Sequence, residues 1–174
     1  NSDTSIKKCP SVVWCKMMLR GVCRALLPQR RGLATIVHVR HTAEAGSPFL
    51  NHVEIENHSL VADEPASVGG QDLGPRPMEM LLMGVGGCSS FDVMSILKKS
   101  RQDVTACHAE LEAERADAVP SVFTRIHLHF VVTGHNLKEK QVERAVSLSA
   151  EKYCSASIML GKAGVEISHS YEIH

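Results

Sequence analysis

Hydrophobic and polar residues alternate along several segments of the chain, which is the pattern of strands that bury one face. In the clearest case, Ile126, Leu128 and Phe130 alternate with arginine and histidines. The alternation predicts strands over 35–41, 51–56, 58–62, 109–114, 125–132 and 165–173. The turn residues Gly46-Ser47-Pro48 between the first two predict a hairpin there. The fourth and fifth strands are expected to pair antiparallel, with glutamates on one facing basic side chains on the other.

Two longer segments predict helices, over 78–99 and over 136–160. Asn136 is expected to cap the second helix, with Glu139 as its capping-box partner. The order of elements is strands, helix, strands, helix, strand. This order predicts an α+β fold in which two long core helices pack on antiparallel sheet.

The first predicted helix contains three glycines, Gly84, Gly86 and Gly87. Each costs roughly 1 kcal/mol of helix propensity relative to alanine. A protein accepts such a cost when another backbone must approach closely. We therefore expect the second long helix, or its counterpart in a partner subunit, to cross this segment.

The composition is that of one globular domain: 174 residues, 44% of them hydrophobic and 22% charged. No uninterrupted apolar run approaches the roughly 20 residues that span a bilayer, so no membrane association is expected. From Glu44 onward there are 18 acidic residues and 11 lysines and arginines, a net charge of −7. Because nucleic-acid binding favours a basic face, this mildly acidic body argues against it.

The N-terminal segment, residues 1–34, has the opposite character, because residues 4–43 include eight basic residues and no acidic one. Such a basic, partly apolar leader is typical of an organelle import peptide and suggests a mitochondrial location. A disordered basic extension on a cytoplasmic protein is the alternative. Residues 35–174 are expected to form the folded domain.

Six cysteines are present, three of them in the leader. The predicted domain keeps Cys88, Cys107 and Cys154, an odd number without a close pair, which favours a reducing compartment over a disulfide scaffold. Their spacing lacks the paired gaps of a structural zinc site. His127 and His129 share one strand face, but surface placement opposite glutamates is preferred to metal binding. The sequence therefore predicts neither a metal nor a cofactor.

Cys88 and Cys154 both lie in predicted helices, where a small buried core residue is the ordinary interpretation. A reactive cysteine must ionise, and Cys88 lies too far into its helix for the helix dipole to help. Asp92, four residues on, would raise the thiol pKa. A reactive Cys88 therefore needs a cation from elsewhere, for which Arg40 and Arg76 are the nearest candidates.

The stretch from Gly74 to Cys88, together with Ser149 to Ser155, resembles the OsmC/Ohr family, most nearly its YhfA-like OsmC branch. The resemblance extends from about Asn51 to Glu172. It implies an OsmC-like fold in an intertwined homodimer, with two active sites at the subunit interface.

The same resemblance implies a thiol-dependent peroxidase that reduces organic hydroperoxides. Cys88 matches the family's peroxidatic cysteine, which becomes a sulfenic acid, and Cys154 matches the resolving cysteine, which condenses with it to a disulfide. A dithiol reductant, such as a lipoylated protein, would restore both thiols.

Two positions depart from the family's pattern. The family glutamate directly follows the proline, a place that Met78 occupies here, so Glu79 stands one residue late and is expected to face solvent or cap the helix. The family arginine lies in a glycine-rich hairpin, whereas Arg40, the candidate activator, lacks that context. Two alternatives therefore stay open: a non-enzymatic dimeric module that binds a small molecule or senses redox state, and an enzyme acting on a persulfide or another sulfur species.

Overall fold

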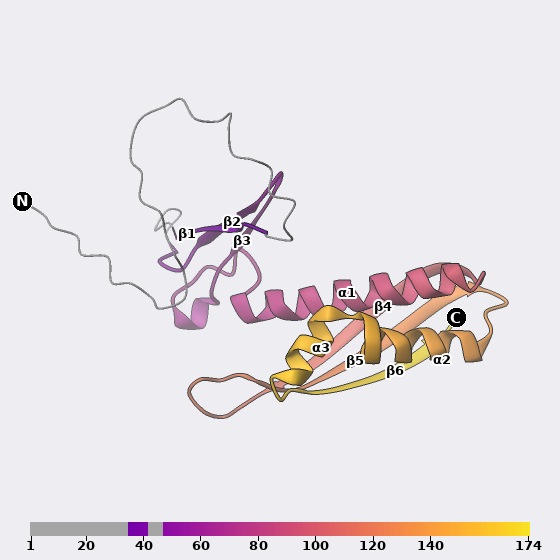
Figure 1. Cartoon of the computed structure of the whole chain (residues 1–174). Helices are drawn as coiled ribbons and strands as arrows, with labels where there is room; N and C mark the ends of the chain where they lie inside the picture. Colours follow the sequence, from indigo (N-terminus) through magenta and orange to yellow (C-terminus); the bar gives the residue numbers. More distant parts are fainter. Residues whose placement is uncertain (1–34, 42–46) are drawn as a thin grey trace, which may run out of the picture. The chain divides into compact units, whose positions relative to one another are not determined.

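The computed structural model describes residues 35–41 and 47–174 (Figure 1). The predicted leader, 1–34, lies outside these described residues. The elements occur in the predicted order, and the fold is α+β.

The first sheet is a small antiparallel one, in the order β1-β2-β3. Its strands are β1 (His38–His41), β2 (Asn51–Ile55) and β3 (His58–Ala62). Arg40 pairs with His52, and Val53 pairs with Leu60. The predicted hairpin between the first two strands is therefore confirmed in its antiparallel pairing.

A buried aspartate organises the loop that follows β3. The Ser47 hydroxyl donates a hydrogen bond to Asp63 at 2.6 Å, and the backbone N–H groups of Glu64, Gln71 and Leu73 donate three more. Hydrogen bonding to the ionised form favours it, so the pKa of Asp63 lies below its ordinary value, with Ser47 as the largest cause. A short 3-10 helix, η2 (Ala66–Val68), lies within this loop.

The second sheet has the order β4-β5-β6 and carries most of the core. Its strands are β4 (Asp103–Arg115), β5 (Phe123–His135) and β6 (Glu166–Ile173). The β4–β5 pair is antiparallel as predicted, with glutamates opposite His127, His129 and Arg125. The expectation of a wholly antiparallel sheet is wrong for β6, which pairs parallel to β5. A parallel pair needs a crossover, and the helices between these strands supply it.

Among the residues described, three α-helices rather than the predicted two lie on one face of this sheet (Figure 1). They are α1 (Pro77–Lys99), α2 (Glu139–Leu148) and α3 (Ser155–Lys162). α1 contacts β4 and α2, while α2 and α3 contact β6. The fully buried core between helices and sheet contains Val85, Val93, Leu97, Ile126, Leu128, Phe130 and Val142.

The prediction of one continuous second helix is wrong. After α2 the backbone widens into a single π-helical turn, η3 (Ser149–Tyr153), and Cys154 then adopts an extended conformation before α3 begins. The predicted cap is wrong as well. Asn136 has a left-handed φ of 51°, and Lys138 occupies the N-cap of α2 without a side-chain hydrogen bond. Tertiary contacts, described below, hold this break in place.

Candidate thiol site

The structure brings Cys88 and Cys154 together although 66 residues separate them in the sequence. Cys88 lies in the middle of α1, and Cys154 lies at the start of α3, which contacts α1. Their sulfurs and a carboxylate oxygen of Asp92 all lie within 4.8 Å of one another. Cys88 and Asp92 are four residues apart and therefore share one face of the helix.

Cys154 is fully buried and accepts hydrogen bonds from the first turn of α3. It is the N-cap residue, and its sulfur accepts from the Ser157 N–H at 3.5 Å and from the Ser157 hydroxyl at 3.2 Å. Both donors approach from the positive end of the helix, which stabilises a thiolate. The break before α3 thus creates an anion-stabilising environment for this sulfur.

Ser89 contributes a third polar contact from α1. Its hydroxyl oxygen lies 3.3 Å from the Cys154 sulfur and 2.7 Å from the Val85 carbonyl oxygen. A hydroxyl has one hydrogen, so Ser89 donates it either to the Val85 carbonyl oxygen or to the Cys154 sulfur. Burial by itself would raise the pKa of Cys154, but the hydrogen bonds from Ser157 and Ser89 outweigh it, and the pKa lies below its ordinary value.

Cys88 has the opposite electrostatic environment and is partly buried. Burial is the largest cause that raises its pKa, and the neighbouring Cys154 and Asp92 raise it further. The Ala156 N–H opposes these effects without reversing them. In the single chain, the thiol that ionises more readily is therefore Cys154.

Asp92 lies beside both sulfurs. Its Oδ2 atom is buried, and no described residue forms a hydrogen bond with it. Burial disfavours the charged carboxylate and raises the pKa of Asp92.

The two other predicted site residues, Glu79 and Arg40, form their hydrogen bonds and ion pairs with residues other than the two cysteines. Glu79 caps α1, because its Oε2 accepts a hydrogen bond from the Arg76 N–H at 2.9 Å and its Oε1 lies 3.8 Å from the Arg76 guanidinium. Capping the helix was one of the two roles expected for it. Arg40 pairs with Glu54 on the neighbouring strand at 2.6 Å. Within the described part of the chain, no lysine or arginine forms a hydrogen bond or ion pair with Cys88, Cys154 or Asp92.

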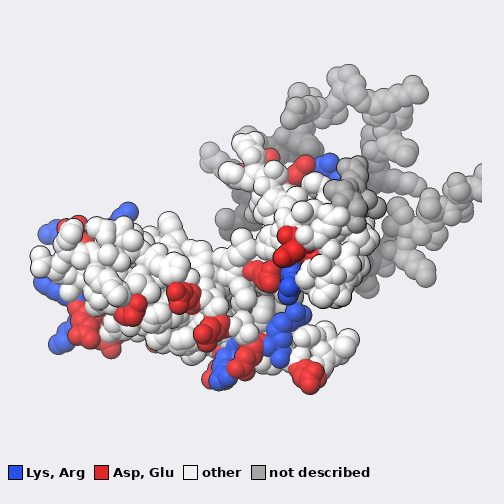
Figure 2. Space-filling model, turned by 180° about the vertical axis from the view of Figure 1, so that it is seen from behind, with Lys and Arg blue, Asp and Glu red and all other residues white. Residues whose placement is uncertain are grey.

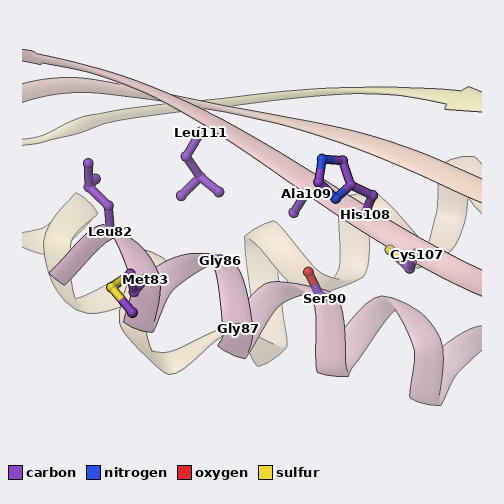
Figure 3. Close-up of a pocket in the computed structure, with 9 residues that line it drawn as sticks. All are labelled: Leu82, Met83, Gly86, Gly87, Ser90, Cys107, His108, Ala109 and Leu111. Carbon is purple, nitrogen blue, oxygen red and sulfur yellow. The ribbon is translucent and has the colours of Figure 1, made fainter. Parts of the chain in front are cut away.

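A hollow of about 460 Å³ lies between α1 and β4 (Figure 3). Both apolar and polar residues line it: Leu82, Met83, Gly86, Gly87 and Ser90 from α1, and Cys107, His108, Ala109 and Leu111 from β4. A Cβ at Gly86 would meet Leu111 Cδ1 at 2.9 Å. A Cβ at Gly84 or Gly87 would meet none of the residues that the structure describes within 4 Å.

The histidine pair of β5 lies on the sheet face away from the helices. The His127 ring nitrogens lie 2.8 and 2.9 Å from the hydroxyls of Ser168 and Ser170, and His129 Nδ1 lies 2.8 Å from Ser170. Both rings therefore contact serine hydroxyls and face glutamates of β4, as the sequence predicted for their placement. On the face shown in Figure 2, basic side chains lie next to acidic ones.

Two residues of the site, Ser89 and Ser157, escaped sequence reasoning, which placed Asp92 near Cys88 but not near Cys154. The sequence does contain two signals for these serines, the pair Cys88-Ser89 and the spacing Cys154-x-x-Ser157. The second spacing is the N-cap to N3 relation of a helix start, but it becomes readable only once the helix is known to break at Cys154.

The arrangement of the chain is shared with known proteins. The OsmC-like protein family model matches residues 69–170, which include both cysteines. The chain belongs to the OsmC-like family. It is 59% identical over 102 residues to Protein YhfA of Escherichia coli K12, a match that covers 59% of this chain and 75% of that protein.

Solved structures agree with this assignment. A hypothetical protein from Aquifex aeolicus is 31% identical and superposes with a TM-score of 0.66, covering 81% of this chain and 98% of that one. An organic hydroperoxide resistance protein OsmC from Legionella pneumophila has a TM-score of 0.59 over 80% and 96% of the two chains. At 16% identity, that second likeness supports the fold alone.

Proposed function

We propose that this OsmC-like protein is a thiol-dependent peroxidase for organic hydroperoxides. The observation that carries the proposal is the convergence of Cys88 and Cys154 within 4.8 Å, in a site that lowers the pKa of one thiol. A disulfide needs an S–S distance near 2.05 Å, which side-chain rotation and a small shift of α3 would supply. Membership of the OsmC-like family supports organic hydroperoxides as the substrate class.

In the proposed reaction, Cys88 attacks the O–O bond, because it is the less buried of the two thiols. Its proton passes to the neighbouring Cys154 thiolate. The bond breaks, the alkoxide takes up a proton and leaves as alcohol, and Cys88 becomes a sulfenic acid. The Cys154 thiol then forms the disulfide, and water leaves with the sulfenic hydroxyl. An external dithiol, for which a lipoylated protein is the proposed source, reduces the disulfide and is itself oxidised.

We infer that the protein works as a homodimer. α1 is long and apolar enough by composition to cross a membrane, yet only 28% of its most apolar window is buried. Met83 and Phe91 are 61% and 71% exposed, and Gly84 and Gly87 lie on the same side of the helix. This face borders Cys88. A second copy would cover it, close the site and bring a second Arg40 as the proposed activating cation.

The test is a mass measurement on reduced protein treated with one equivalent of cumene hydroperoxide. A Cys88–Cys154 linkage is expected, and Cys107→Ser should form it equally well. Cys88→Ser should abolish peroxide turnover. Cys154→Ser should allow one turnover and then stop at the sulfenic acid or a higher oxide. Absence of the linkage in folded wild type would contradict the proposal and favour the non-enzymatic binding module.

The role of Arg40 has its own measurement. Arg40→Lys keeps a positive charge but loses the planar guanidinium, whereas Arg40→Ala loses both. A fall in the rate of the first oxidation step, larger for alanine than for lysine and absent from the reduction step, would support activation of Cys88 by this residue. Equal rates in all three proteins would refute it.

A further inference from the structure

Cys88, Asp92 and Cys154 form a cluster of three potential metal ligands. Within residues 35–41 and 47–174 no other group brings three such side chains together. Two of the donors come from one helix at positions i and i+4, and the third comes from the start of α3. Histidines at i and i+4 of a helix ligate zinc in the same way. The spacing of cysteines in the sequence could not reveal this cluster, since the carboxylate completes it.

The unpartnered oxygen of Asp92 is a second, independent observation. A buried polar atom without a partner costs about 1–3 kcal/mol. Asp92 Oδ2 is buried, and no described residue satisfies it. A cation bound beside the two sulfurs would satisfy this oxygen directly.

The donor set also specifies the kind of cation. Thiolates select soft or borderline metals over calcium and magnesium, and Zn²⁺ accepts sulfur and carboxylate oxygen together. Zinc–ligand bonds of about 2.0–2.3 Å in a tetrahedron place neighbouring ligand atoms roughly 3.3–3.8 Å apart. The cluster spans at most 4.8 Å, so a contraction of about 1 Å, within reach of side-chain rotation, would close it.

The surroundings of Cys154 resemble the outer shell of a metal site. Ligands in such sites are held by hydrogen bonds from neighbouring groups. The Ser157 N–H and hydroxyl already orient the Cys154 sulfur, and the Ser149 hydroxyl donates to the Ser89 carbonyl oxygen at 3.2 Å, which ties η3 to α1.

We propose that the reduced protein binds one Zn²⁺ per chain through Cys88 Sγ, Cys154 Sγ and an Asp92 carboxylate oxygen. Three protein ligands leave the fourth position open to water or an external thiol, as in catalytic zinc sites. Each coordinating thiol releases its proton on binding. Because a Cys88–Cys154 disulfide would use the same two sulfurs, zinc and the disulfide exclude each other.

The test uses cobalt as a spectroscopic probe in the full chain, reduced and kept free of oxygen and peroxide. One equivalent of Co²⁺ should produce a thiolate-to-cobalt charge-transfer band and the visible bands of a tetrahedral site, and Zn²⁺ should remove both. Cys88→Ser and Cys154→Ser should lose at least part of the charge-transfer band. Asp92→Asn should bind at least about tenfold more weakly. Cys107→Ser, whose thiol lies on β4, should match wild type.

Two further measurements keep the result interpretable. Asp92→Glu retains a carboxylate, so it should bind more tightly than Asp92→Asn if the two variants fold equally by circular dichroism. Oxidising the wild type to its disulfide with a thiol oxidant should abolish the cobalt spectrum. Absence of a charge-transfer band in reduced wild type would overturn the proposal. It would also be overturned if Asp92→Asn and Cys107→Ser bound Co²⁺ with equal affinity. Neither result bears on peroxide turnover, which is measured separately.

Discussion

Replacing Gly84 and Gly87 by alanine tests whether a second copy covers α1. A Cβ at either position would meet no atom of the described part of the chain within 4 Å. Each substitution should therefore stabilise an uncovered helix by about 1 kcal/mol. Together they would contribute about 2 kcal/mol, which for a domain of this size corresponds to a rise in melting temperature of roughly 6 °C.

The outcome reverses if another helix packs on this face. Inserting a methyl group into a close contact costs about 1–3 kcal/mol. At each position the dissociation constant of the dimer would then rise by roughly 5- to 150-fold. We expect this second result, because the described residues 35–41 and 47–174 offer no structural reason for glycine at either position.

The assay is sedimentation or light scattering over a range of protein concentrations, together with thermal unfolding at each concentration. Gly86→Ala is the matched control, since its Cβ would meet Leu111 within the chain and should affect folding more than association. A double variant that associates like wild type, and melts higher at every concentration, would refute the argument that this face is covered.

Four further predictions concern other parts of the chain. Ser157→Ala removes a donor from the Cys154 sulfur, so the pKa of Cys154 should rise, as measured by the ultraviolet absorbance of its thiolate. Asp63 has a folded-state pKa below its ordinary value of 3.8, so stability should fall as pH drops below that value and through the folded-state pKa. In urea unfolding at a series of pH values, the free energy of unfolding of Asp63→Asn should depend less on pH in this range than that of wild type. Gly70→Ala would place a Cβ 1.8 Å from the Glu64 carbonyl oxygen and should destabilise the fold by about 3 kcal/mol or more in chemical denaturation. Gly161→Ala is the control, because its Cβ has its nearest contact at 3.9 Å and should leave the stability unchanged or raise it. Residues 1–34 fused to a fluorescent protein should direct it to mitochondria, and diffuse fluorescence would contradict the predicted import role.

Much of the fold follows from local pattern, because each long strand alternates around a buried face and each helix has a sustained apolar run. Sequence reasoning placed the β4–β5 pairing correctly, since glutamates on one strand oppose basic side chains on the other. It missed the parallel pairing of β6, because alternation reports which face is buried and not the direction of the neighbouring strand. It brought Cys88 and Cys154 together only through a family resemblance.

The helix break at Cys154 could not be predicted from propensity, because Ala150, Glu151 and Lys152 are all good helix formers. Tertiary contacts hold it instead. The Ser149 hydroxyl bonds the Ser89 carbonyl oxygen of α1, and the Cys154 N–H reaches back to the Ser149 carbonyl oxygen at 2.8 Å, five residues away. The first contact depends on how α1 lies against the second helix, which no local window contains, whereas the second is the local hydrogen bond that closes the π-helical turn.

The break also supplies hydrogen-bond donors that lower the pKa of Cys154 against the effect of burial. In a continuous helix, the Ser157 N–H would bond the Tyr153 carbonyl oxygen four residues earlier. Because the helix restarts at Ser155, that N–H has no intrahelical partner and points to the Cys154 sulfur instead. A straight helix would remove the Ser157 N–H from the Cys154 sulfur, so that fewer hydrogen bonds would oppose burial, which raises the pKa of Cys107. The chemistry of this site therefore depends on an interruption of secondary structure as well as on the cysteine itself.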